Sequence, residues 1–221
     1  MIGTNSGDFM KDLIIIGAGG FGREVSWLVE RINQVNREWN IIGFADDNEN
    51  LWGSVVDGYP VIGPAEEIQS FPTAYVVCCI ANTEIRQKIC KKVDEYPITF
   101  ATLIDPAAIV SDKVMIGSGT VICAGAVLTV DITIGEHCII DVNSTVGHDA
   151  VLEDYVTLYP SVNVSGNTLI CRGVELGTGT QVIQGKTVGA NTIVGAGAVV
   201  INDMPGNCTA VGVPAKVIKQ R

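Results

Sequence analysis

The feature that most constrains this chain is an aliphatic residue at every sixth position from Ile104 to Val200. Each of the seventeen positions in this series holds isoleucine, leucine or valine, and no insertion interrupts the spacing. A second series, four residues further on, holds small or medium-sized uncharged residues except at Lys186 and Met204. A period of six matches neither the amphipathic helix, with a period of about 3.6, nor the ordinary strand, with a period of about 2. The repeat therefore predicts a β-helical solenoid in which each hexad forms one short strand and one turn.

The hexads 116–121 (IGSGTV), 176–181 (LGTGTQ) and 194–199 (VGAGAV) resemble those of the hexapeptide-repeat family. The resemblance implies an all-β, left-handed parallel β-helix with three hexads in each triangular coil, the aliphatic residue inside and the small residue at a tight corner. Seventeen hexads would form about 5.7 coils, a column about 27 Å tall at the usual strand spacing. Because both ends of such a column are open, we expect residues 1–103 and the tail after Met204 to cover them.

Residues 1–103 show a different pattern, in which apolar runs alternate with segments of helical spacing. The expected strands are 13–16, 41–44, 59–62 and 74–80, and the expected helices are 21–33 and 85–93. This alternation predicts a small Rossmann-like α/β domain, followed after a short junction by the β-helix domain over 104–221. The first nine residues are expected to be loosely held, which makes Met10 a candidate start.

The composition argues against several classes of partner. The net charge is −10 and both halves of the chain are negative, which disfavours nucleic acid and anionic membranes. No apolar run reaches the roughly 20 residues of a membrane-spanning helix. The seven cysteines form an odd set without a CxxC pair. We therefore expect free thiols in a reducing cytoplasm, with no disulfides and no metal site.

The string GAGGFG at 17–22 follows a predicted strand and opens a predicted helix. In that context the backbone amides at the start of the helix accept phosphate, and an acid at the end of the next strand, here Asp46, holds a ribose hydroxyl. The simpler alternative is a tight turn that needs only the freedom of glycine. A nicotinamide site is disfavoured, because about 100 residues leave no second mononucleotide-binding half.

The two histidines are both predicted to lie outside the prism. His148 is next to Asp149 and seven residues after Asp141, and carboxylates near an imidazole stabilise its charged form and fix its tautomer, as a general base requires. His137 has no adjoining aspartate and is expected to be solvated without a role. One coil of 18 residues stacks Gly166 on His148, where the lack of a side chain would let a backbone amide approach a ligand.

Seven segments resemble, in order, the bacterial acyltransferase family of sialic-acid O-acetyltransferases and nucleotide-amino-sugar N-acetyltransferases. They are 17–24, 44–47, 80–86, 146–160, 165–167, 194–200 and 211–218. The resemblance implies an N-terminal domain that holds a nucleotide-sugar and acetyl-CoA lying along the β-helix between the subunits of a homotrimer. It also implies a role in lipopolysaccharide or capsule biosynthesis.

The resemblance further implies a role for each matching residue. His148 would be the general base, Asp149 would raise its basicity, and the Gly166 amide would meet the thioester carbonyl. The substrate-binding residues would be Gly19, Gly20 and Phe21 at the diphosphate, Asp46 and Asp47 at the nucleoside, Ala81 and Asn82 nearby, and Asp141, where several members carry an asparagine that places the amine. The pantetheine arm would contact Thr157, Thr178 and Ala196.

Four functions remain to be compared. The first is acetyl transfer to the amino group of a nucleotide-linked 4-amino-deoxysugar, by direct attack and without a metal. The second keeps this chemistry but acetylates a sialic-acid hydroxyl. The third, a zinc hydrolase on the same prism, needs three histidines, and the chain has two. The fourth is a nucleotide-binding scaffold without catalysis.

Overall fold

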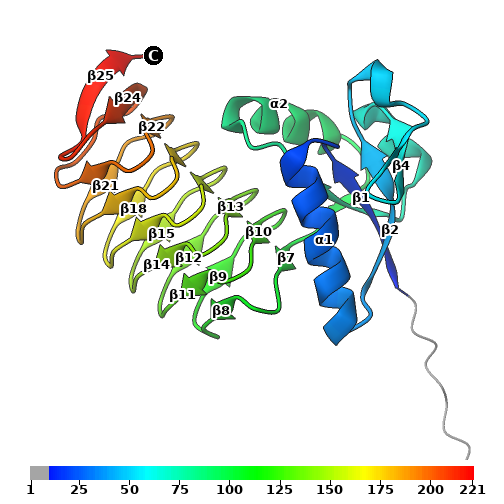
Figure 1. The fold of residues 1–221 in the computed structure, drawn as a ribbon, viewed down its shortest axis with the longest axis horizontal. Coiled ribbons are helices and arrows are strands. Elements are labelled where there is room, and N and C mark those ends of the chain that lie inside the picture. Colours follow the sequence, from blue (N-terminus) through cyan, green and yellow to red (C-terminus); the bar gives the residue numbers. More distant parts are fainter. Residues whose placement is uncertain (1–9) are drawn as a thin grey trace, which may run out of the picture.

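The computed structural model describes residues 10–221 as an α/β domain at one end of a long column of short strands (Figure 1). The prediction for the first nine residues lies outside this range. The column consists of seventeen two-residue strands, and each residue of the aliphatic series is the second residue of its strand. The strands are β7 (Leu103–Ile104), β8 (Ile109–Val110), β9 (Met115–Ile116), β10 (Val121–Ile122), β11 (Val127–Leu128), β12 (Thr133–Ile134), β13 (Ile139–Ile140), β14 (Thr145–Val146), β15 (Val151–Leu152), β16 (Thr157–Leu158), β17 (Asn163–Val164), β18 (Leu169–Ile170), β19 (Glu175–Leu176), β20 (Gln181–Val182), β21 (Thr187–Val188), β22 (Ile193–Val194) and β23 (Val199–Val200).

These strands form three parallel sheets, which are the three faces of a prism. The first face carries β7, β10, β13, β16, β19 and β22, the second face runs from β8 to β23, and the third face runs from β9 to β21. Strands pair with the strand one coil away, so that Val121 is opposite Ile139, 18 residues later. The predicted left-handed parallel β-helix is confirmed. We call the turns that follow first-face, second-face and third-face strands the first, second and third corners.

The inside of the prism is filled by the two predicted series. From Ile122 onward every member of the aliphatic series is buried, and most of the small residues four positions later are buried with them. The tail closes the far end, because β24 (Cys208–Val211) extends the first face, β25 (Lys216–Gln220) pairs with β24, and Ala215 joins the core. The near end is covered less than expected, since Ile104 keeps 37% of its surface exposed.

From Gly119 to Gly197 each turn of the column contains one residue in the left-handed backbone region, at intervals of six. Glycine, asparagine and aspartate supply most of these positions, as expected for a conformation that penalises a Cβ. His137 and Tyr155 occupy it at the third corner with φ of 55° and 60°. Two residues with bulky side chains therefore have an unfavourable backbone conformation on neighbouring coils of the third corner.

The N-terminal domain is a mixed six-stranded sheet in the order β3-β4-β2-β1-β5-β6 with helices on both faces. Its elements are β1 (Lys11–Ile16), α1 (Gly20–Val35), β2 (Trp39–Ala45), the 3-10 helix η1 (Glu49–Leu51), β3 (Val55–Val56), β4 (Tyr59–Gly63), the 3-10 helix η2 (Ala65–Ser70), β5 (Tyr75–Cys78), α2 (Thr83–Val93) and β6 (Thr99–Phe100). The predicted Rossmann-like core is confirmed, whereas β3, β6 and both 3-10 helices were not expected. Runs of two or three residues, as in β3, β6 and η1, carry no periodicity, and the six residues of η2 are fewer than two α-helical turns.

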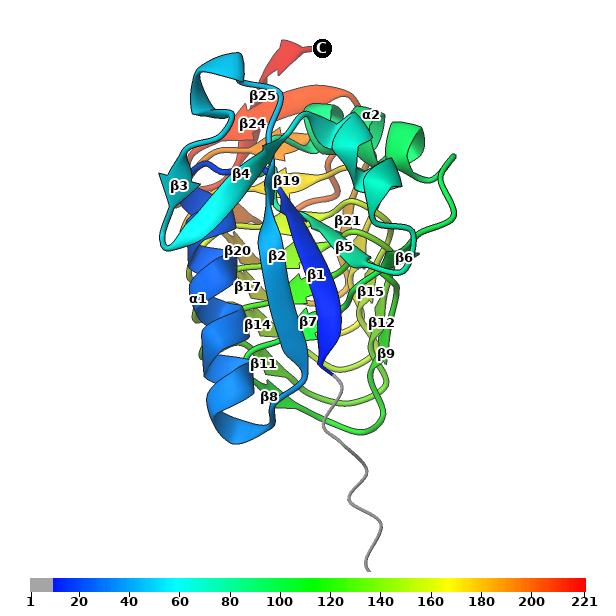
Figure 2. The same ribbon diagram turned by 90° about the vertical axis from the view of Figure 1, so that its right-hand side faces the viewer.

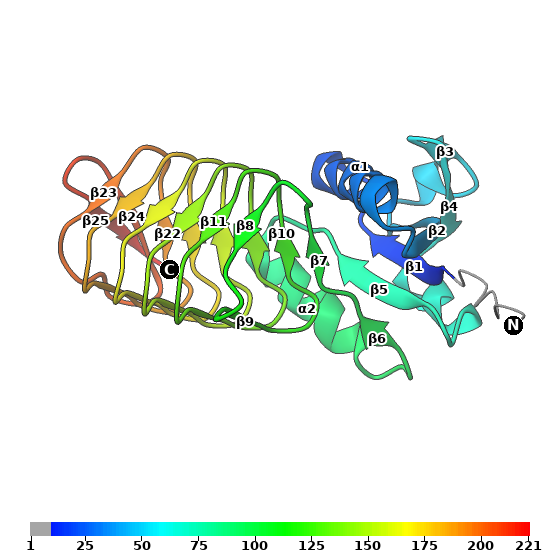
Figure 3. The same cartoon turned by 90° about the horizontal axis from the view of Figure 1, so that it is seen from below.

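The two domains are packed against each other rather than tethered (Figures 2 and 3). Leu103 and Val121 belong to the same apolar cluster as β1 and α1. Arg31 of α1 forms a bidentate ion pair with Asp105, at 2.8 and 3.0 Å, and that carboxylate is buried. The last strand of the first sheet is β6, and the boundary expected after residue 103 falls inside β7.

All seven cysteines are free. Within residues 10–221 the structure contains no helix that combines the length and the apolar character required to cross a membrane.

Candidate active site

A cavity of about 400 Å³ lies at the carboxyl ends of β1, β2 and β5. This is the point at which the strand order reverses, because β2 lies on one side of β1 and β5 on the other. Ligands of open α/β sheets bind in such a crevice. Six of the residues expected to bind the nucleotide-sugar line it, namely Gly19, Gly20, Phe21, Asp46, Asp47 and Ala81. We call this cavity the nucleotide pocket.

The glycines of the pocket have two different physical roles. A Cβ on Gly22 would lie 1.8 Å from the Gly17 carbonyl oxygen, so only glycine lets α1 start this close to β1. A Cβ on Gly19 or Gly20 would meet no atom within 4 Å. These two positions face open space, which leaves room for a ligand against the backbone.

The N-terminus of α1 is suited to an anion. Its N-cap residue, Gly19, provides no side-chain cap, and the first turn contains no acidic residue. The backbone amides of the first turn and the helix dipole therefore point positive charge toward the pocket. A diphosphate at this end of a 16-residue helix would complement both.

The Asp46 carboxylate organises the pocket as well as lining it. Its Oδ2 accepts a hydrogen bond from the Ala18 amide at 2.8 Å, and its Oδ1 accepts one from the Asn48 amide at 2.9 Å. Asp47 is exposed and accepts from the Ala65 amide at 3.2 Å. Each carboxylate oxygen retains further lone pairs, so Asp46 can hold the glycine loop and a ligand hydroxyl together.

Asn82 has a local structural role. Its side-chain oxygen accepts a hydrogen bond from the Ile85 amide at 2.9 Å, which caps α2. Asn82 is not among the residues that line the nucleotide pocket, whereas its neighbour Ala81 is. Of these two expected substrate-binding residues, only Ala81 therefore lines the nucleotide pocket.

His148 and Asp149 form an exposed pair at the second corner. The imidazole Nδ1 lies 2.7 Å from Asp149 Oδ2. A carboxylate only accepts hydrogen bonds, so the proton of the neutral ring lies on Nδ1 and the lone pair lies on Nε2. Half of the His148 side chain, 52%, is exposed, and the residue is therefore open to a ligand from outside the prism.

Gly166 lies one coil from His148, as the 18-residue stacking predicts. A Cβ on Gly166 would be 2.6 Å from His148 Nε2, and the Asn167 amide donates to the His148 carbonyl at 2.7 Å. Within residues 10–221 the Gly166 amide itself has no hydrogen-bond acceptor. An exposed imidazole and an unused backbone donor are therefore close together.

Thr178 and Ala196 are also stacked, but at the first corner. The Gly197 amide donates to the Thr178 carbonyl at 2.8 Å, and both Thr178 and Ala196 are exposed. The second face separates this corner from His148 and Gly166. A single chain therefore does not bring the expected catalytic and pantetheine-binding residues to one place.

The expected contact of Thr157 with pantetheine is not supported. Only 1% of Thr157 is exposed, because α2 covers this part of the first face. Its hydroxyl accepts a hydrogen bond from Arg86 Nη2 at 2.7 Å and lies 3.2 Å from the hydroxyl of Thr83. No surface of Thr157 is left for a cofactor.

Asp141 is at the first corner, whereas His148 is at the second corner. The spacing of seven residues suggested that the two side chains would lie close together in space, and they do not. Asp141 lines a cavity of about 310 Å³ with Glu24 and Trp27 of α1. Burial raises the pKa of the Asp141 carboxyl, and the negative Glu24 raises it further, against a hydrogen bond from the Val142 amide. Seven residues carry the chain across one face of the prism, which is why neighbours in sequence point in different directions.

The prediction that His137 is solvated is wrong. Only 5% of it is exposed, because α2 and β6 pack over the third corner. Its ring stacks on Tyr155 at 4.9 Å and meets Phe100 edge-on at 4.5 Å. Burial, together with the charge of Arg86, lowers the pKa of His137 to about 4. His137 is therefore a neutral packing residue between the domains.

This burial predicts a specific pH dependence of stability. The folded-state pKa of His137 lies below the unfolded value of 6.5, so the unfolded chain binds the proton more tightly. The stabilisation is complete above pH 6.5 and is lost as the pH falls toward 4, with a loss of about 1 kcal/mol by pH 5.5. His137→Asn tolerates the left-handed backbone but does not titrate. In chemical unfolding, the stability difference between wild type and His137→Asn should shrink from pH 7.5 to 5.5; a constant difference would contradict the assignment.

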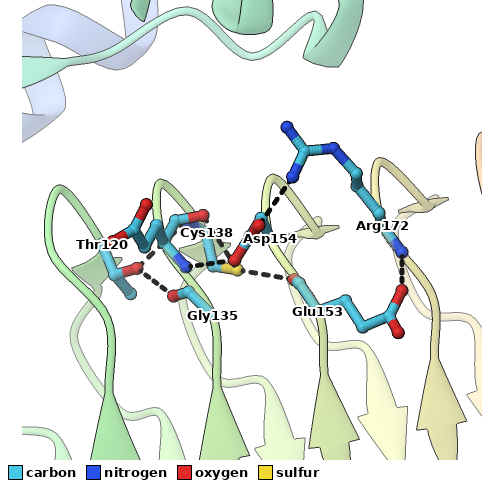
Figure 4. Close-up of polar contacts among 7 residues, drawn as sticks. Thr120, Gly135, Cys138, Glu153, Asp154 and Arg172 are labelled. Carbon is cyan, nitrogen blue, oxygen red and sulfur yellow. Dashed lines mark hydrogen bonds and ion pairs between the residues drawn. The ribbon is translucent and has the colours of Figure 1, made fainter. Parts of the chain in front are cut away.

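Polar bonds between successive coils brace the same corner (Figure 4). Thr120 donates to the Gly135 carbonyl at 2.9 Å, and the Cys138 thiol donates to the Glu153 carbonyl at 3.2 Å. Arg172 reaches back one coil, with its amide on Glu153 at 2.7 Å and its guanidinium on Asp154 at 2.6 Å. The corner that receives α2 is thus a rigid base. In the described part of the chain, no three His, Cys, Asp or Glu side chains gather as metal ligands would.

Comparison with known proteins agrees with this architecture. Residues 12–93 match the family model of the PglD N-terminal domain. GDP-perosamine N-acetyltransferase of Escherichia coli O157:H7 is 31% identical over 93% of this chain and 96% of its own length. The perosamine N-acetyltransferase of Caulobacter crescentus, solved with CoA and GDP-perosamine, superimposes with a TM-score of 0.85 at 30% identity, covering 94% of this chain and 97% of the other.

The acetyltransferase domain of PglB from Neisseria gonorrhoeae has a TM-score of 0.86 at 33% identity, covering 94% of this chain and all of that one. The same domain was also solved with acetyl coenzyme A. Likeness of this extent includes both domains, not the hexad repeat alone. The chain therefore belongs to the hexapeptide-repeat acyltransferase family of the sialic-acid O-acetyltransferases and nucleotide-amino-sugar N-acetyltransferases, and it is an acyltransferase.

Proposed function

We propose that this protein transfers the acetyl group of acetyl-CoA to the amino group of a nucleotide-linked amino-deoxysugar used in bacterial surface glycans. The observation that carries the proposal is the nucleotide pocket, where the glycine loop, the open N-terminus of α1 and Asp46 surround one cavity. The relatives from Escherichia coli and Caulobacter crescentus, similar over the whole chain, are named for N-acetylation of perosamine, and the Caulobacter enzyme was solved with CoA and GDP-perosamine.

The proposed reaction is direct attack. The amine nitrogen forms a bond to the thioester carbonyl carbon, and His148 Nε2 takes a proton from the amine. The carbon–sulfur bond then breaks and the proton passes from His148 to the sulfur, so that CoA leaves as the thiol and the imidazole is neutral again. Asp149 stabilises the imidazolium through the 2.7 Å bond to Nδ1. The Gly166 amide, adjacent to Nε2, donates to the developing oxyanion.

We further propose a homotrimer, because the residues assigned to one cofactor lie on two different corners of the prism. His148 and Gly166 are at the second corner, whereas Thr178 and Ala196 are at the first. A single CoA can contact both pairs if the first corner of one chain packs near the second corner of the next. Such a contact joins two unlike surfaces, and rotational symmetry closes it without an open end.

Light scattering checks this assembly. With a chain mass of 23.4 kDa, the protein should elute with a mass near 70 kDa at micromolar concentration. A monomer that keeps full acetyltransferase activity would contradict the shared site.

Asp46 should control affinity for the nucleotide-sugar. Loss of a charge-assisted hydrogen bond costs about 1.5–3 kcal/mol, so Asp46→Ala should raise the KM for the nucleotide-sugar about ten- to hundredfold. Asp46→Asn keeps one acceptor oxygen for the Ala18 amide and should show a smaller increase. The KM for acetyl-CoA is the control and should not change. Equal increases in both KM values would show general damage instead.

The test of the proposed function is a screen of acceptors by release of free CoA thiol. The acceptors are UDP-, GDP- and dTDP-linked 4-amino sugars and free sialic acid, each with acetyl-CoA. Thiol release with a nucleotide-amino sugar, together with the mass of an acetamido product, supports the proposal. Release with sialic acid alone would establish O-acetylation, and nucleotide binding without release with any acceptor would establish a scaffold.

A further inference from the structure

Arg86, on α2, is a cation buried completely between the two domains. None of its surface is exposed, and within residues 10–221 it forms no ion pair with a carboxylate. Burial lowers its pKa from the usual range. A buried guanidinium requires partners for its five N–H groups, and here backbone carbonyls supply most of them.

One side of the guanidinium holds the wall of the nucleotide pocket. Nη1 donates to the Ile80 carbonyl at 2.7 Å and to the Ala81 carbonyl at 3.0 Å. Ile80 and Ala81 lie two and three residues after the end of β5, and both line the nucleotide pocket. These bonds attach Arg86 to the backbone that shapes the pocket.

The other side of the guanidinium holds the β-helix. Nε donates to the His137 carbonyl at 3.1 Å, and Nη2 donates to the Tyr155 carbonyl at 2.9 Å. His137 and Tyr155 are the two bulky residues with a left-handed backbone at the third corner. Arg86 therefore bonds to the carbonyl groups of these same two turns. Thr157 adds its hydroxyl at 2.7 Å from Nη2. One rigid, planar group therefore joins the pocket wall to two successive coils.

We infer that Arg86 is a positioning residue, which holds the nucleotide pocket at a defined place on the β-helix so that a bound sugar presents its amino group to the acetyl donor. This inference rests on the proposed function, because it takes the pocket to hold the nucleotide-sugar. Misplacement of a reacting group by about 1 Å can lower a rate about a hundredfold, so a rigid connection at this point matters for turnover.

The chain contains a matched comparison in Arg31. It also joins the domains, through its two hydrogen bonds to buried Asp105, but it contacts no residue of the nucleotide pocket. Loss of domain packing alone should therefore affect variants of Arg31 and Arg86 alike. Loss of pocket placement should appear only in variants of Arg86.

The experiment compares Arg86→Lys with Arg31→Lys in the full-length protein, with GDP-perosamine and acetyl-CoA as probes. A lysine keeps the charge but cannot bond to both sides at once. For Arg86→Lys we expect the KM for GDP-perosamine to rise about tenfold and kcat to fall at least tenfold, with the KM for acetyl-CoA within twofold. For Arg31→Lys all three values should stay within twofold, although both variants lower the melting temperature. Thr157→Val removes one of the contacts of Arg86, together with the contact to the Thr83 hydroxyl, and should shift the same values two- to fivefold.

Unchanged kinetics of Arg86→Lys, at a temperature where it is fully folded, would overturn the inference and leave Arg86 a stabilising residue only. If Arg86→Lys does not fold, the KM and kcat values of Thr157→Val test the inference instead. The two- to fivefold shifts given above support it, and unchanged values contradict it. If the wild type acetylates no acceptor, the proposed function fails, and hydrogen–deuterium exchange over residues 79–89 decides about Arg86. Faster exchange there in Arg86→Lys than in Arg31→Lys supports positioning, whereas equal exchange contradicts it.

Discussion

His148→Ala should lower kcat by about 10²- to 10⁴-fold, the usual contribution of a general base. The KM for acetyl-CoA should stay within about twofold, because backbone groups and the first corner are proposed to hold the cofactor. The measurement is thiol release as a function of pH, with the acceptor found in the screen.

Asp149→Asn provides the graded control for this prediction. The amide can still hydrogen-bond to the ring but no longer carries the negative charge that stabilises the imidazolium, so kcat should fall by less than in His148→Ala. The Asp149 side chain is 61% exposed, so solvent weakens the effect of its charge. If His148→Ala keeps most of the activity, His148 is not the base.

Gly166→Ala should lower kcat at least a hundredfold. The backbone of Gly166 lies outside the left-handed region, so alanine adds no backbone strain, but its Cβ would be 2.6 Å from His148 Nε2. The imidazole is half exposed and can turn away, which removes the base from its position beside the Gly166 amide. Misplacement of a reacting group by about 1 Å can lower a rate about a hundredfold, which is the loss of kcat expected here.

The control is Gln184→Ala, at the same place in the hexad one coil further along the prism. Gln184 is exposed, so its truncation should leave both the melting temperature and kcat unchanged. Gly166→Ala should likewise keep a melting temperature close to that of the wild type, because a surface ring can absorb the clash. Normal turnover by Gly166→Ala would show that His148 does not act from its observed position.

Local patterns in the sequence predicted most of the backbone. From Ile122 onward the aliphatic residue of each hexad is buried, because the spacing within the hexad and the pairing with the next coil both direct its side chain into the prism. The stacking of Gly166 on His148 follows from the same 18-residue coil. The glycine string at 17–22 likewise placed the nucleotide pocket, since Gly22 must pack against Gly17 wherever this turn occurs. In each case contacts within one turn or between successive coils determine the result.

Local sequence patterns do not show which outward-facing side chains of the prism are covered by the N-terminal domain. His137 and His148 both point out of the prism, yet α2 buries His137 and lowers its pKa, whereas His148 stays open. Thr157 and Asp141 are buried for the same reason, by α2 and α1. Arg86, whose guanidinium joins both domains, has no local signal for this role, because its partners on the β-helix are the carbonyls of His137 and Tyr155, 51 and 69 residues away. The hexad period specifies inside and outside, but docking of a second domain against one face depends on contacts distant in sequence, and only the tertiary structure decides them.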